Sequence, residues 1–198
     1  MVRRIVLLLA IMMSALVAGT TGAVAQPRPS PTRSPTHSPS VSASEQDRTF
    51  LIEAHQGNLA EIRAGRLAQE KATTKSLREL GTKMVKDHTK LDTKVRKVAR
   101  EAGVQLPREP TKQDQAEIKQ LSGLSGTAFN RAWVQAELPG HRKTLAAINK
   151  QLSNGSSEQV KKVAQEAKPV VQEHLTLLEK AAASASPHVK TPTPHPSH

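Results

Sequence analysis

The chain has 198 residues with 29 Lys or Arg against 17 Asp or Glu, so its formal net charge is +12. It contains no Cys, which excludes disulfides, thiol nucleophiles and Cys-based zinc sites. With no Tyr, one Trp and two Phe, neither a β-sandwich nor a stacking platform for single-stranded nucleic acid is expected.

Residues 1–25 have the features of a secretory signal peptide. Two arginines precede an apolar run over about 5–19, and Ala23 and Ala25 place small residues where a signal peptidase reads. An uncleaved membrane anchor is the alternative, since the run is nearly long enough to span a bilayer. We expect cleavage between Ala25 and Gln26, which predicts a secreted, periplasmic or envelope protein with no transmembrane span in the mature chain.

Two flanking segments, 26–44 and 183–198, are rich in Pro, Ser and Thr and are expected to be disordered. The folded domain is therefore expected at 45–182. It carries 24 basic and 17 acidic residues, a net charge of +7, which permits weak binding to anionic cell-envelope polymers. Nucleic acid is not an expected partner of an exported chain with so few aromatic residues.

The domain segment is composed of good helix formers, with Gly and Pro mostly at breaks, and it predicts an all-α fold. Four long helices are expected at about 46–72, 74–102, 125–152 and 156–182. Short breaks make the first two helices, and the last two, antiparallel hairpins. The long connection at 103–124 can cross a ferritin-like four-helix bundle and contain a short helix near 112–120. A simple up-and-down bundle with a loose loop is the alternative.

Each long helix carries one residue of a metal-ligand type on its apolar stripe: Glu61, His88, His141 and His174. All four lie near mid-helix, and Glu61 and His88 are expected to face each other at one level. Buried carboxylates and imidazoles need partners. The four either form a hydrogen-bonded polar layer that fixes register, or bind one transition-metal ion such as zinc, iron or copper.

Three carboxylates close to these histidines are candidates to orient them, and Glu137 is a candidate ligand as well: Asp87, Glu137 and Glu173. Asp87 and Glu173 each precede a histidine of the stripe, and Glu137 lies one turn before His141. Pro139 predicts a kink in the same helix. The kink either re-aims this part of the site or is a tolerated local defect.

Several segments within 47–181 resemble the secreted bacterial family called domain of unknown function 4142. The more specific matches are M-V-x-D-H at Met84–His88 and E-H-L at Glu173–Leu175, and Gly57 with Glu61 matches a Gly-x-x-x-Glu pattern. The family usually has Asp-His where this chain has Gly140-His141. The resemblance implies a ferritin-like fold, and its members are often labelled outer membrane proteins, but it supplies no reaction.

A di-iron site of the ferritin type is not expected, because Val85 and Val171 stand where those bundles place a Glu three residues before each His. No hydrolase elbow, phosphate loop or dinucleotide motif occurs, so no catalytic residue is predicted and an enzyme is the least favoured hypothesis. The two leading hypotheses are a helical bundle that binds one metal ion, and a cationic envelope-binding module with a purely structural polar layer.

Overall fold

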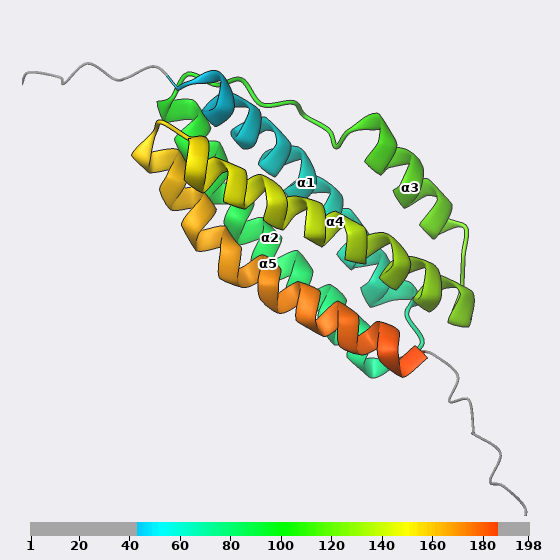
Figure 1. The fold of residues 1–198 in the computed structure, drawn as a ribbon. Helices are drawn as coiled ribbons and strands as arrows, with labels where there is room; N and C mark the ends of the chain where they lie inside the picture. Colours follow the sequence, from blue (N-terminus) through cyan, green and yellow to red (C-terminus); the bar gives the residue numbers. More distant parts are fainter. Residues whose placement is uncertain (1–42, 186–198) are drawn as a thin grey trace, which may run out of the picture. The chain divides into compact units, whose positions relative to one another are not determined.

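The computed structural model describes residues 43–185, and all the regular structure in this range is helical (Figure 1). The helices are α1 (Glu45–Lys71), α2 (Lys75–Glu101), α3 (Lys112–Ser122), α4 (Gly126–Asn154) and α5 (Glu158–Ala185). The predicted signal peptide and nearly all of both predicted flanking segments lie outside the described residues, and export stays a prediction. Within 43–185, no helix combines the length and the apolar character that a membrane span requires.

The helix ends follow local signals in the sequence. Ser44 caps α1 in a reciprocal capping box with Asp47, and the Thr74 hydroxyl caps α2. Gly103 follows α2 with φ of 65°, a left-handed conformation that glycine adopts without a steric cost. At the other end of the domain, α5 continues to Ala185, beyond the predicted limit at 182, because a run of alanines favours helix.

The topology is two antiparallel hairpins joined by a crossing connection. α1 packs against α2 and α4 packs against α5, while α1–α4 and α2–α5 contacts close the bundle. Asn130 Nδ2 donates to Thr73 Oγ1 (2.6 Å), so α4 begins where α1 ends. At the opposite end, Gln151 Nε2 donates to Asp47 Oδ1 (2.6 Å). The connection after α2 therefore runs the length of the bundle, as predicted, and α3 within it lies against α1 and α4 (Figure 1).

The core consists of two apolar clusters separated by a polar layer. One cluster includes Phe50, Leu51 and Ile148, and the other includes Trp133 and Leu178. The histidines on α2, α4 and α5 lie in sequence between members of the two clusters and are buried. A polar layer at mid-bundle thus has an apolar cluster on each side of it along the bundle axis.

α1 and α2 approach each other closely at a pair of glycines, Gly65 and Gly81. A Cβ atom built on Gly81 would lie 2.7 Å from the Ala68 Cβ and 2.7 Å from the Gly65 carbonyl oxygen. Side chains do not tolerate such distances, so the two backbones can meet here only without a Cβ. This contact fixes the register of the first hairpin.

We expect Gly81→Ala to lower the free energy of unfolding by about 1–3 kcal/mol, because the added methyl group forces the helices apart. The matched control is Gly57→Ala in α1, where a built Cβ meets nothing within 4 Å. This control is expected to be neutral or stabilising by up to about 1 kcal/mol, since alanine is the better helix former. Urea unfolding of both variants checks the prediction, and equal effects would contradict it.

Candidate metal centre

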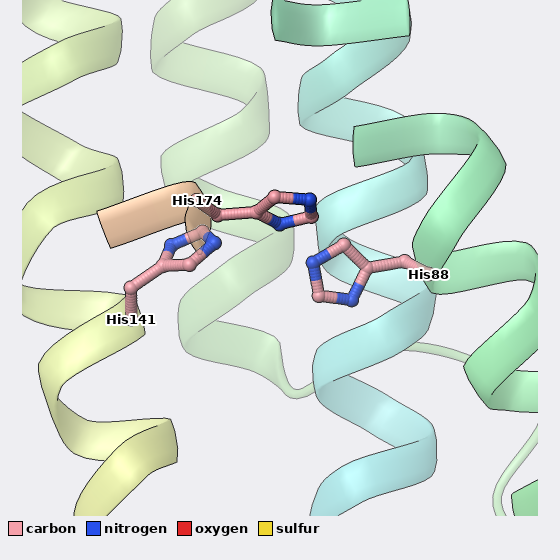
Figure 2. Close-up of side chains that lie close together, drawn as sticks. All are labelled: His88, His141 and His174. Carbon is pink, nitrogen blue, oxygen red and sulfur yellow. The ribbon is translucent and has the colours of Figure 1, made fainter. Parts of the chain in front are cut away.

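Three imidazoles from three helices converge in the polar layer (Figure 2). The ring centroids of His88, His141 and His174 are 5.2 to 5.9 Å apart. Their residues are 3%, 1% and 0% exposed, respectively. Each ring offers one nitrogen within 4.8 Å of the nitrogens of the other two, a spacing suitable for a shared metal ion.

Each of the three rings has one nitrogen held by a hydrogen-bond acceptor. The pairs are His88 Nδ1 with Asn58 Oδ1 at 2.8 Å, His141 Nδ1 with the Glu137 carbonyl oxygen at 3.0 Å, and His174 Nε2 with Asp87 Oδ2 at 3.0 Å. These oxygens accept, so the held nitrogen of each ring carries the hydrogen. In a neutral imidazole the other nitrogen then keeps a free lone pair, which is how outer partners prepare a histidine for a metal.

The nitrogens left free by this arrangement have no hydrogen-bond partner among the described residues. They are His88 Nε2, His141 Nε2 and His174 Nδ1, and the fourth buried side-chain atom in this condition is Glu61 Oε2. A buried polar atom without a partner is costly and rare in folded proteins. Within 43–185 the four such atoms belong to the four residues predicted as metal ligands.

Burial keeps two of the imidazoles neutral. It lowers the pKa of His88 to about 4; Glu61 opposes this shift, while His141 and His174 add to it. Burial also lowers the pKa of His174, although the hydrogen bond to Asp87 opposes the shift. These two rings are therefore unprotonated at neutral pH, the form that a metal ion requires.

A pair of carboxyl groups adjoins the imidazoles at His141. Its Nδ1 lies 3.7 Å from Glu61 Oε1 and 3.7 Å from Glu137 Oε2. Burial, the charge of Glu61 and a hydrogen bond to it raise the pKa of Glu137 well above its usual range. Burial would raise the pKa of Glu61 too, but His141, His88 and the hydrogen bond from Glu137 outweigh it and lower that pKa. The two carboxyl groups thus differ in the direction of their pKa shifts: the surroundings favour the protonated form of Glu137 and the ionised form of Glu61.

Of the three carboxylates predicted to orient the histidines, Asp87 and Glu173 have different surroundings in the structure. Asp87 precedes His88 in sequence but holds His174 across the helix interface. Glu173 has a side chain that is 56% exposed; it pairs with Lys83 at 3.0 Å and contacts no imidazole. The same Lys83 ammonium lies 3.0 Å from Asp87 Oδ2. Glu173 is therefore connected to His174 only indirectly, through Lys83 and Asp87.

The residue that faces His88 across the first hairpin is Asn58, one turn before the expected Glu61. The register follows from the glycine contact between Gly65 and Gly81, which shifts the pairing of α1 and α2. No role was predicted for Asn58 from the sequence. A polar residue on an otherwise apolar stripe, one turn from a candidate ligand, is the signal that identifies it.

A fourth buried histidine, also without a predicted role, lies away from this centre. His55 Nδ1 is 2.6 Å from Asp92 Oδ1, and His55 Nε2 is 2.8 Å from the Pro107 carbonyl oxygen. Arg96 Nε contacts the other Asp92 oxygen at 3.1 Å. With both nitrogens engaged, His55 ties the crossing connection to α1 and α2 and is not available as a ligand.

A cavity of about 560 Å³ reaches the centre from the side of α3. Its lining includes Glu61, His88 and Glu137, together with Pro139 and Gly140 of α4. α4 continues through the proline, which the sequence predicted to kink it. A Cβ built on residue 140 would lie 3.9 Å from Glu61 Oε1, an ordinary van der Waals distance, so Gly140 lies beside this carboxylate without crowding it.

Two comparisons with known proteins agree with this architecture. The family model of the domain of unknown function DUF4142 matches residues 32–181. The crystal structure of a DUF305 fragment from Deinococcus radiodurans superposes with a TM-score of 0.64 at 15% sequence identity, over 72% of this chain and 98% of that chain. At this identity the likeness concerns the fold alone. No curated protein matches the chain.

Proposed function

Because the chain belongs to the DUF4142 family, a domain of unknown function, we propose its activity from the site alone: it binds one transition-metal ion. The ligands are His88 Nε2, His141 Nε2 and His174 Nδ1. Three neutral imidazoles suit zinc, copper or iron. The Glu61 carboxylate, which acts electrostatically on all three rings, supplies negative charge to balance the ion.

The observation that carries this proposal is the set of buried atoms without partners. If the polar layer served only to fix register, its members would be expected to satisfy one another by hydrogen bonds. Instead, each ring uses one nitrogen for an outer partner and turns the other toward its neighbours without a bond. Ligand nitrogens of a tetrahedral ion lie about 3.4 Å apart for bonds of about 2.05 Å. Rings whose nitrogens are within 4.8 Å need only small rotations to reach that distance.

We expect the purified protein to retain about one Zn²⁺ per chain after dialysis, measured by atomic emission. In every variant, the four histidines outside the described residues (His37, His188, His195 and His198) are replaced by alanine, because they chelate on their own. His88→Ala combined with His174→Ala is expected to reduce retention at least tenfold.

The matched control replaces the exposed Lys90 and Gln172 with alanine on the same two helices and should retain the ion. Circular dichroism establishes that the variants remain helical. Retention that is absent in the parent protein, or unchanged in the folded histidine variant, would refute the three-histidine site.

A further inference from the structure

The cavity beside the centre is acidic although the domain as a whole is basic. Five carboxyl side chains line it, against the single basic residue Lys143: Glu53, Glu61, Asp114, Glu117 and Glu137. A cleft lined by one sign of charge focuses the electrostatic field and raises the local concentration of the opposite ion. In a protein whose surface repels cations, this cavity is the place where a cation is favoured.

The carboxyls continue from the mouth of the cavity to its inner end. Asp114 and Glu117 stand on α3, and Glu117 is close enough to act electrostatically on Glu137. At the inner end, Glu61 and Glu137 approach His141, and one atom from each of the three lies within 4.8 Å of the others. This second group of ligand-type atoms shares only His141 with the three-histidine group.

The inner end is a built site and not a chance cluster of surface acids. The Glu137 side chain is 5% exposed, and Glu61 Oε2 is buried without a hydrogen-bond partner. His88, which is 3% exposed, lines the same cavity, and its unpartnered Nε2 belongs to the three-histidine group. Among the described residues, no lysine or arginine forms an ion pair with either carboxyl; the ion-pair contacts of both are to His141.

We propose that Glu61 and Glu137, at the inner end of the α3-covered cavity, form a second cation subsite for a hard divalent cation such as Mn²⁺. Carboxylate oxygens and water suit Mn²⁺, whereas imidazoles suit zinc and copper. On binding, the ion takes both carboxylate groups as ligands, and water completes the coordination shell. His141 separates the two subsites, with Nδ1 toward the carboxyls and Nε2 among the ligand nitrogens proposed for the first ion.

The test is a Mn²⁺ titration followed by electron paramagnetic resonance, in which bound Mn²⁺ is lost from the free-ion signal. The full chain carries the four alanine substitutions used above and is first loaded with one equivalent of Zn²⁺. We expect about one Mn²⁺ per chain. Glu137→Gln, which keeps the shape of the side chain and removes an anionic ligand, is expected to weaken Mn²⁺ binding at least tenfold and to leave Zn²⁺ retention unchanged.

Two further variants separate this subsite from the three-histidine site. Glu179→Gln, an exposed carboxylate paired with Arg142, serves as the matched control and should bind Mn²⁺ like the parent. His88→Ala with His174→Ala should lose Zn²⁺ and still bind Mn²⁺. Absence of Mn²⁺ binding in the parent, or an unchanged affinity in Glu137→Gln, would overturn the subsite. Loss of Zn²⁺ retention in the parent, with Mn²⁺ binding intact, would overturn only the three-histidine proposal.

Discussion

Replacing Asp92 with alanine is expected to lower the free energy of unfolding by about 3 kcal/mol, the upper end of the usual cost of leaving a buried polar group without its hydrogen-bond partner. Asp92 and His55 have side chains that are both 7% exposed. His55 Nδ1 lies 2.6 Å from Asp92 Oδ1, and Arg96 Nε contacts the second Asp92 oxygen, so this buried carboxylate is engaged through both of its oxygens. Without Asp92, His55 Nδ1 is left buried without a partner, and only Nε2 keeps its contact with the Pro107 carbonyl oxygen.

The control for this prediction is a surface pair on the same helix. Lys75 and Glu79 are 3.6 Å apart and have side chains that are 84% and 65% exposed. Glu79→Ala is expected to change the free energy of unfolding by no more than about 0.5 kcal/mol. Urea unfolding of both variants gives the two values, and a small effect of Asp92→Ala would show that the buried contact between Asp92 and His55 does not stabilise the fold.

The fold was accessible from the sequence because its signals are local. The side chains of Ser44 and Thr74 cap the N-termini of α1 and α2, and Gly103 ends α2. These signals can be identified from the sequence without any tertiary information. The crossing connection was also predictable, since about twenty residues with two prolines between hairpins exceed what a tight turn needs. The confirmed parts of the prediction are thus those in which neighbours in sequence determine the structure.

The register between helices was less accessible. An apolar stripe specifies which face of a helix is buried, but it leaves the helix free to slide along its partner by a turn. The contact of Gly65 with Gly81 sets that slide, and it brings Asn58 opposite His88 where Glu61 was expected. Glycine pairs of this kind signal a close approach only once the pairing of the two helices is known.

The roles of the flanking carboxylates depended on the same information. Asp87 and Glu173 occupy equivalent places in sequence, each one residue before a histidine. Yet Asp87 lies at the α2–α5 interface and holds His174, whereas Glu173 faces solvent beside Lys83. Sequence spacing gives the angle between adjacent side chains, but which neighbour lies in that direction is decided by the packing. The acidic cavity was likewise invisible, because it forms only where α3 lies across α1 and α4.

The metal-free protein is expected to lose stability as the pH falls from about 6.5 to about 4. Burial lowers the pKa of His88 from its ordinary 6.5 to about 4 in the folded state. Between these values the unfolded chain takes up a proton that the folded chain does not, so each step toward acid favours unfolding. At about 1.36 kcal/mol per pKa unit, the contribution of His88 amounts to about 3 kcal/mol over this range.

The groups around His88 modify this slope in known directions. His174 has a lowered pKa and acts in the same sense, and the lowered pKa of Glu61 adds a loss below its ordinary value of 4.5. Glu137 acts in the opposite sense: its raised pKa stabilises the folded protein at acid pH, and this contribution fades as the pH rises. The other titratable groups that act electrostatically on His88 are His141 and Asp87.

The His88 contribution is isolated by comparing the parent protein with His88→Gln, whose amide does not titrate, in the presence of a chelator. Unfolding free energies are measured in urea at intervals from pH 7 to pH 4. We expect the parent to lose about 3 kcal/mol more than the variant across this range. If the unfolding free energies of the parent and of His88→Gln fell in parallel with pH, the His88 ring would be protonated in the folded state as readily as in water. The neutral imidazole on which the three-histidine site depends would then be absent at mildly acid pH.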